Sequence, residues 1–193
     1  MPIRPWTVFS PPHPSPRVGA DNARYPLKQA LRQDLTFDTK AFRQALGAFP
    51  TGVVVVTAAA EAEPVGITVN SFTSVSLDPP LVLWCLKKDS QRYAGFVEAR
   101  SYTISVLGTE HEDVSARLAR QGEHRLRDLG LLATELGPPA LADALAIFEC
   151  AAHAMHEGGD HMILIGRVLR FARRDTGAPL VFHRGRYGAL SDA

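Results

Sequence analysis

The residues best suited to chemistry lie in one short stretch, residues 66–80, where hydroxyl and amide side chains alternate with apolar ones. Apolar residues such as Ile67, Val69 and Phe72 can face a core while the polar residues between them face a ligand. The polar residues are Thr68, Asn70, Ser71, Ser74 and Ser76. They offer hydrogen-bond donors and acceptors without charge, which suits a flat ligand with a polar edge. The alternative is a half-buried strand and turn, because Asn-Ser and Asp-Pro pairs favour turns.

A second polar group, residues 87–90, stands between an apolar strand and a helix expected over residues 91–99. Two lysines, a hydroxyl and the exposed amides of a helix start suit an anion such as a phosphate. The alternative is an ordinary capped helix with its lysines in solvent. A basic cluster near a helix expected over residues 110–121 can meet a diphosphate or simply face solvent. It consists of Arg117, Arg120, His124, Arg125 and Arg127.

Three histidines near a predicted turn, His153, His156 and His161, suggest a metal site at first. Strand geometry argues against it, because positions 153 and 156 differ by an odd number and point to opposite faces. The chain has no Cys-x-x-Cys pair, and the His-Glu pair at residues 111–112 lacks the second histidine of an HExxH helix. We therefore expect no metal. His161 follows a tight turn in which Asp160 can orient its ring.

The elements that must position these residues are mostly strands. Residues 53–60 are apolar without alternation and rich in β-branched types, which predicts a strand covered on both sides. Other strands are expected over residues 65–70, 81–86, 101–106, 146–156, 161–172 and 179–187, with a turn at 157–160. A helix over residues 38–47 would place Phe42, Ala45, Leu46 and Phe49 on one face. The pattern predicts a mainly β domain over residues 37–193 with flanking helices.

Composition narrows the class of protein further. A chain of 193 residues suits one domain, and residues 1–36, with six prolines in the first 16, predict a flexible extension. The formal net charge of +1 gives no reason to expect nucleic acid or an anionic membrane as partner. No apolar run is long enough to span a bilayer. Cys85 and Cys150 lie far apart in apolar runs, so we expect free thiols in a soluble, cytoplasmic protein.

These motifs, in this order, resemble the flavin reductase family, which has the FMN-binding split β-barrel fold. The resemblance rests on residues 52–57, 66–80 and 85–90 and on Gly159-Asp160-His161, and it extends over about residues 37–190. Family members serve as the reductase components of two-component flavin-dependent monooxygenases. The resemblance implies hydride transfer from NADH or NADPH to FMN or FAD, and a separate oxygenase that receives the reduced flavin.

The resemblance also implies a role for each site residue. The flavin ring edge would lie along Thr68, Val69, Asn70 and Ser71, and the ribityl chain along Ser74, Val75 and Ser76. Lys88 and Ser90 would lie toward the phosphate, with Thr51 near the ring. His161, beside Asp160, would border the nicotinamide, and Tyr187 would lie close to the active site.

Two further expectations concern the whole protein. The chain has no Gly-x-Gly-x-x-Gly after a strand, so flavin and pyridine nucleotide would share one shallow cleft. A cleft between the barrel and a second subunit suits a homodimer. Two other functions stay open from the residues: an FMN-binding electron carrier or sensor without NAD(P)H oxidase activity, and a β-barrel interaction module without cofactor.

Overall fold

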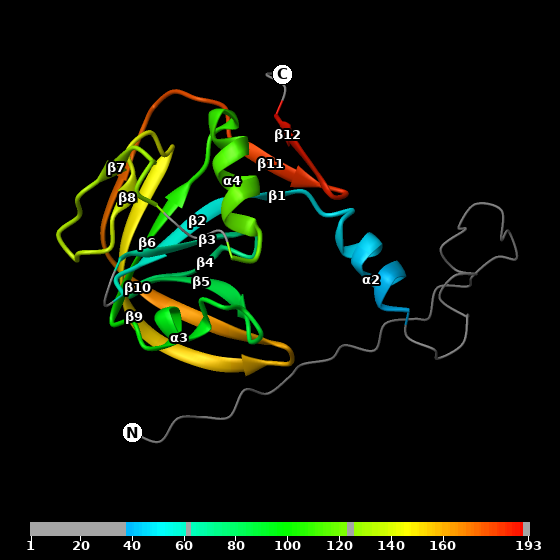
Figure 1. Cartoon of the computed structure of the whole chain (residues 1–193), viewed down its shortest axis with the longest axis horizontal. Helices are drawn as coiled ribbons and strands as arrows, with labels where there is room; N and C mark the ends of the chain where they lie inside the picture. The colour runs from blue at the N-terminus through cyan, green and yellow to red at the C-terminus, as the bar shows by residue number, and fades with distance from the viewer. Residues whose placement is uncertain (1–37, 61–62, 123–125, 191–193) are drawn as a thin grey trace, which may run out of the picture. The chain divides into compact units, whose positions relative to one another are not determined.

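The computed structural model describes residues 38–60, 63–122 and 126–190, and the predicted extension at residues 1–36 lies outside them. Its main element is an antiparallel seven-stranded sheet in the order β3-β2-β6-β9-β10-β5-β4 (Figure 1). The strands are β2 (Val54–Ala58), β3 (Val65–Val69), β4 (Thr73–Leu77), β5 (Pro80–Lys87), β6 (Ser101–Val106), β9 (Ala146–Gly158) and β10 (His161–Arg173). The predicted class, mainly β with flanking helices, is confirmed.

Two smaller sheets complete the strands. One has the order β1-β11-β12, with β1 at Thr51–Gly52, β11 at Leu180–His183 and β12 at Arg186–Ala189. The other pairs β7 (Leu131–Leu132) with β8 (Ala140–Leu141). The single closing strand predicted over residues 179–187 was wrong, because the chain reverses at Arg184 and Gly185, whose φ angles are 49° and 78°. Glycine accepts this left-handed conformation readily, so the hairpin turn forms there.

Strand β2 is covered on both sides, as its unbroken apolar run predicted. Val54 and Val56 belong to one buried cluster, which contains Trp84 and Tyr102. Val53 and Val55 belong to a second cluster, which includes Leu118 and Leu180. Because side chains alternate along a strand, one strand contributes to both cores.

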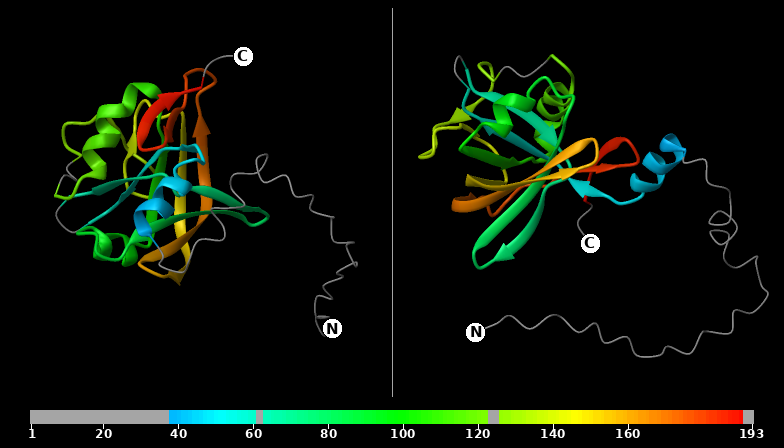
Figure 2. Two further views of the ribbon diagram at one scale, coloured as in Figure 1. Left: turned by 90° about the vertical axis from the view of Figure 1, so that its right-hand side faces the viewer. Right: turned by 90° about the horizontal axis from the view of Figure 1, so that it is seen from below.

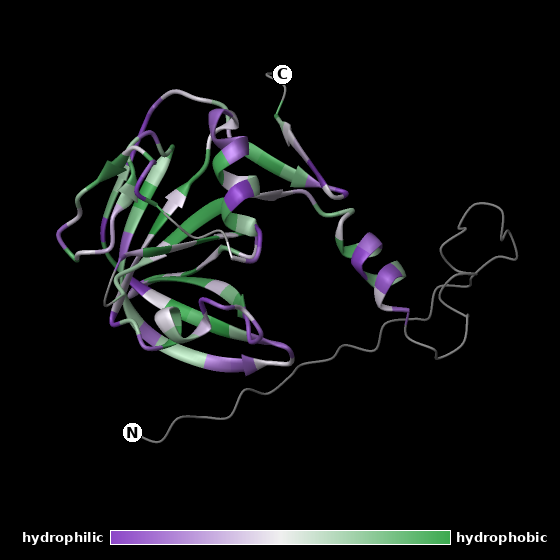
Figure 3. Cartoon of the chain, viewed as in Figure 1, coloured by the Kyte–Doolittle hydropathy of each residue, from purple (hydrophilic) through white to green (hydrophobic). Residues whose placement is uncertain are grey.

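The described helices are short and lie outside the sheets. They are α2 (Thr39–Leu46), α3 (Tyr93–Val97), the 3-10 turn η2 (Thr109–His111) and α4 (Glu112–Ala119). Helix α4 packs on β3 and buries Ser115 and Leu118. No residue of α2 is buried. In Figure 3 the hydrophobic residues concentrate in the strands, whereas α2 and α4 carry hydrophilic and hydrophobic residues in turn.

Candidate functional site

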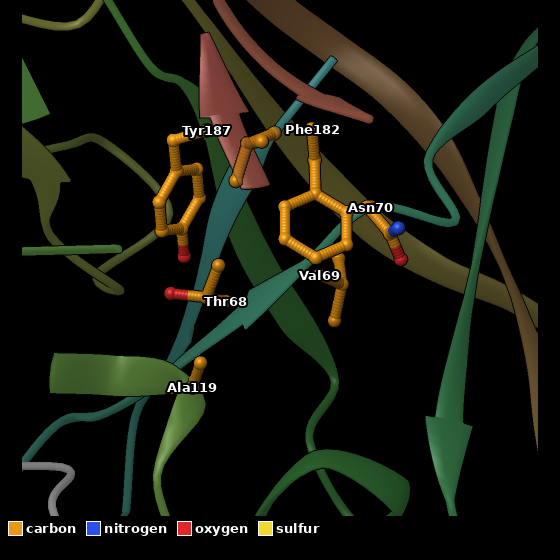
Figure 4. A pocket seen from close by; sticks show the side chains of 7 residues that line it. Thr68, Val69, Asn70, Ala119, Phe182 and Tyr187 are labelled. Atoms are coloured by element: carbon orange, nitrogen blue, oxygen red, sulfur yellow. The ribbon is translucent and has the colours of Figure 1, made fainter. Parts of the chain in front are cut away.

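A cavity of about 150 Å³ lies beside the end of β3 and contains part of the predicted ring-edge group. We call it the β3 cavity. Its lining residues are Val53, Thr68, Val69, Asn70, Ala119, Phe182 and Tyr187 (Figure 4). Four of these, Thr68, Val69, Asn70 and Tyr187, were predicted from the sequence. The lining has no ionisable group apart from the tyrosine phenol, so the cavity suits an uncharged, flat ligand surface.

Buried Ser115 on α4 holds two walls of the β3 cavity together. Its backbone oxygen accepts a hydrogen bond from the Thr68 hydroxyl at 2.9 Å. Its own hydroxyl lies 2.8 Å from the phenol oxygen of Tyr187. Thr68 and Tyr187 are therefore oriented by the same helical residue, which fixes β3 relative to β12. Sequence reasoning missed Ser115, although its three-residue spacing from Leu118 places both on the inward face of α4.

The second wall is an aromatic pair on the β11–β12 hairpin. Phe182 and Tyr187 are cross-strand partners, and their ring centroids lie 5.4 Å apart at an interplanar angle of 63°. Thr51 on β1 pairs with Phe182, so the two residues share one face of this small sheet. The Thr51 hydroxyl oxygen is buried and has no hydrogen-bond partner among the described residues. Buried hydroxyls normally have a hydrogen-bond partner, so this one is an exception among the described residues.

A second cavity, of about 220 Å³, begins where the first ends, and we call it the α3 cavity. Ala119 lines both cavities, and the neighbours Ile67 and Thr68 line one each. The remaining lining residues are Lys87, Asp89, Ser90, Gln91, Arg92, Arg120, Gln121 and Gly122. Ser90 accepts a hydrogen bond from the Arg92 amide at 3.2 Å. Arg92 in turn donates to the backbone oxygens of Leu118 and Arg120, so it holds this wall to the end of α4.

Several predicted site residues lie apart from the two cavities. The Ser71 hydroxyl accepts a hydrogen bond from the Cys85 amide at 2.9 Å. Ser74, Val75 and Ser76 lie on β4, the edge strand of a hairpin that projects from the sheet (Figure 2). The Lys88 ammonium lies 3.6 Å from a Glu157 carboxylate oxygen. The chain therefore brings only part of the predicted set into one enclosed place.

His161 and Asp160 lie at the β9–β10 turn, outside the linings of both cavities. The His161 ring nitrogen Nδ1 is 2.8 Å from an Asp160 carboxylate oxygen. This hydrogen bond lowers the pKa of Asp160. The predicted orientation of His161 by Asp160 is thus present, and His161 pairs with Lys87 across β10 and β5.

The described part of the predicted basic cluster is largely neutralised by carboxylates. Arg117 pairs with Asp128 at 2.5 Å, and Arg127 pairs with Glu63. The same Arg117 hydrogen bond holds the pKa of Asp128 below its ordinary value. His124 and Arg125 lie outside the described residues. In the described part of the chain no group of three or more His, Cys, Asp or Glu side chains is arranged to hold a metal ion.

The sequence and fold of this chain match a known class of protein. The family model described as "Flavin reductase like domain" matches residues 46–191. The chain belongs to this family.

Particular relatives agree with that assignment. The chain is 49% identical over 154 residues to the FMN reductase (NADH) SmoA of Agrobacterium fabrum, covering 80% of this chain and 87% of that protein. It is 35% identical over 153 residues to HsaB of Rhodococcus jostii, a flavin-dependent monooxygenase reductase subunit, covering 79% of this chain and 78% of that protein. Among solved structures, the NADH:FAD oxidoreductase SgcE6 of Streptomyces globisporus has a TM-score of 0.77 at 36% identity, covering 82% and 98% of the two chains.

The arrangement of residues fits a flavin on the evidence of this chain alone. The Thr68 hydroxyl lines the β3 cavity, and its bond to Ser115 leaves its oxygen lone pairs as an acceptor. Asn70 offers an exposed amide at the rim. Val53, Ala119 and Phe182 complete the apolar surface that a ring needs, and none of the three was predicted. No described helix has both the length and the hydropathy to cross a membrane.

Proposed function

We propose that this protein is a flavin reductase that transfers a hydride from NADH to FMN or FAD and supplies the reduced flavin to a separate oxygenase. The observation that carries the proposal is the β3 cavity, which combines two uncharged polar residues, Thr68 on β3 and Asn70 just after it, with an aromatic pair on the β11–β12 hairpin. NADH is the preferred reductant in this proposal, because SmoA and SgcE6 are named for it. The role of HsaB as a reductase subunit supports the separate oxygenase.

The protein's part in the reaction is positioning. A bound flavin supplies the hydride-accepting ring. Asn70 and the neighbouring backbone present fixed donors to its polar edge. The Thr68 hydroxyl, whose proton is donated to the Ser115 backbone oxygen, presents an acceptor, while Phe182 and Tyr187 limit how the ring can tilt. Fixed donors and a fixed geometry can carry catalysis without a strong acid or base. This explains why the cavity contains hydroxyls and an amide instead of paired carboxylates.

The flavin phosphate belongs, in this proposal, toward Ser90 in the α3 cavity. The two cavities meet at Ala119, so one extended molecule can lie along β3 and reach both. Lys87 and Lys88 provide positive charge nearby, although each has a carboxylate partner within 4.0 Å. In this proposal the flavin also lies along the β3–β4 connection and β4, which follow Asn70 in the chain. The residues concerned are Ser71, Ser74, Val75 and Ser76.

We also propose that the protein is a homodimer. The β3 cavity is smaller than the 300–1,000 Å³ typical of small-molecule sites, so one chain alone does not enclose a tricyclic ring. Leu46 and Phe49 at the end of α2 are 59% and 74% exposed, an apolar surface that a second copy would cover. The free cysteines and the need for cellular NADH favour the cytoplasm.

The test is a kinetic one on the purified full chain. NADH oxidation is measured with and without added FMN, FAD or riboflavin. Rapid oxidation that depends on added flavin is the expected result. A tightly bound flavin that NADH cannot bleach would instead identify an electron carrier and contradict the proposal.

His161 provides a second arm of the same test. If its ring borders the nicotinamide, His161→Ala raises the KM for NADH about fivefold to tenfold and leaves flavin affinity unchanged. Asn70→Ala is the matched variant with the opposite expectation, since it removes an amide at the flavin rim. Unchanged NADH kinetics in the His161 variant would show that this residue only shapes the turn.

A further inference from the structure

The α3 cavity has two walls that come from distant parts of the chain. One wall comes from within residues 87–92, and the other is the end of α4 with the residues that follow it, 119–122. The elements behind these walls belong to different cores. Phe96 of α3 lies in the buried cluster that contains Trp84, whereas Leu118 of α4 lies in the second cluster. The width of the cavity therefore depends on contacts that join one wall to the other.

The side chain of Arg92 joins the two walls directly. Its Nη1 and Nη2 atoms donate hydrogen bonds to the backbone oxygens of Leu118 and Arg120, at 2.9 Å and 2.7 Å. These two residues flank Ala119, which lines both the α3 cavity and the β3 cavity. The last carbonyls of a helix lack partners within it, and the planar fork of a guanidinium reaches two acceptors at once. Arg92 therefore fixes the place where the two cavities meet.

The backbone of Arg92 holds the opposite wall. Its amide donates to the Ser90 hydroxyl oxygen at 3.2 Å, and the Tyr93 amide donates to the Ser90 backbone oxygen at 3.0 Å. A hydroxyl that accepts a hydrogen bond can still donate its own proton, so Ser90 suits a phosphate oxygen. One residue thus positions both walls, with its backbone on one side and its side chain on the other.

The β3 cavity has a separate fastening. Ser115, one helical turn before Ala119, bonds to Thr68 and Tyr187 and holds that cavity together. Arg92 does not line the β3 cavity, and it is only 6% exposed, so solvent competes little for its hydrogen bonds. Loss of the Arg92 fork should therefore disturb the α3 cavity more than the β3 cavity.

We propose that Arg92 is a positioning residue for the flavin phosphate, through which the enzyme selects phosphorylated flavins over riboflavin. This proposal rests on the flavin reductase function proposed above. FMN and FAD occupy both cavities, whereas riboflavin has no phosphate and needs the β3 cavity alone. A shift of about 1 Å between the walls would separate Ser90 from the phosphate, and a misplacement of this size can cost up to about 10²-fold in rate.

The test compares kcat/KM for FMN with kcat/KM for riboflavin, with NADH as reductant, in the full chain and two variants. Arg92→Lys keeps the positive charge but loses the fork that reaches two carbonyls, and Arg92→Gln removes the charge as well. We expect the ratio of FMN to riboflavin kcat/KM to fall about tenfold in both variants. The KM for riboflavin should change less than about twofold.

Thr103→Val is the control for a loss of stability. Thr103 is fully buried and lies outside both cavities, and its hydroxyl donates to the Pro138 backbone oxygen at 2.7 Å. This variant should unfold at lower urea concentration and keep the ratio of the unaltered protein. A purely structural role for Arg92 would have the same signature, because loss of folded protein lowers both kcat/KM values together.

An unchanged ratio in Arg92→Lys would overturn the proposal, since the fork to two carbonyls would then be dispensable. An unaltered protein that reduces FMN and riboflavin with equal kcat/KM would overturn it as well. Failure of the unaltered protein to oxidise NADH with any added flavin would instead contradict the flavin reductase function.

Discussion

Ser115 is the residue on which the shape of the β3 cavity depends most directly. It is fully buried and orients both Thr68 and Tyr187. Ser115→Ala leaves the Tyr187 phenol without this partner, so we expect the flavin KM to rise several-fold and the unfolding free energy to fall by about 1 kcal/mol. Tyr187→Phe should have a similar effect. Because the two changes remove one interaction, the double variant should be little worse than either single variant.

The control for Ser115 is a hydroxyl with a similar hydrogen bond elsewhere. Ser101 donates to the Leu136 backbone oxygen at 3.2 Å and lies outside both cavities. Ser101→Ala should reduce stability to a similar extent without changing the flavin KM. Urea unfolding measures the stability, and steady-state kinetics measure the flavin KM. An unaltered flavin KM in Ser115→Ala would mean that the Ser115–Tyr187 contact serves stability alone.

The two cysteines differ in reactivity. Cys150 is fully buried, and burial raises the pKa of its thiol to about 12. Since the thiolate is the reactive form, iodoacetamide at pH 8 should label half-buried Cys85 first and Cys150 only on unfolding. The raised pKa also means that the folded state keeps a proton that the unfolded chain loses. Stability from this group is therefore present below about pH 9 and declines above it. Mass spectrometry of labelled peptides checks the order.

At the scale of elements, strand β10 packs tightly against its neighbours at Gly166. A Cβ atom there would overlap the Tyr102 hydroxyl and lie 3.0 Å from the Cys150 Cβ. Gly166→Ala should therefore destabilise the fold by about 1–3 kcal/mol through overpacking. Gly188→Ala is the matched control, since no atom lies within 4 Å of its Cβ position. Urea unfolding of both variants measures the difference, and equal stabilities would show that Tyr102 moves aside freely.

Local pattern was sufficient to predict some elements and insufficient for others. The apolar run at β2 predicted double burial because no alternation left a polar face. The β11–β12 hairpin was missed, because its turn consists of Arg184 and Gly185 and gives a weaker signal than Asn-Gly. Thr68, Val69 and Asn70 were predicted together because they are consecutive in the chain, at the end of β3. Phe182 and Ala119 were missed because only tertiary packing brings them to β3.

At the scale of the whole molecule, the exposed apolar end of α2 tests the proposed dimer. Leu46→Ser/Phe49→Ser removes two side chains that a second copy would cover. We expect the molar mass in light scattering to change from that of a dimer to that of a monomer, with weaker flavin binding. Leu132→Ser, which alters a half-exposed leucine on β7, is the control. A monomeric mass for the unaltered chain would contradict the dimer.

Double burial of β2 has a consequence for how the molecule comes apart. Neighbouring valines of this strand alternate between two separate cores, and its hydrogen bonds join β3 to β6. Loosening either core would release the strand from the other, so the cores should melt together in a single cooperative transition. The β2 amides should then exchange their hydrogens with solvent more slowly than any others in the described chain, and only through global opening.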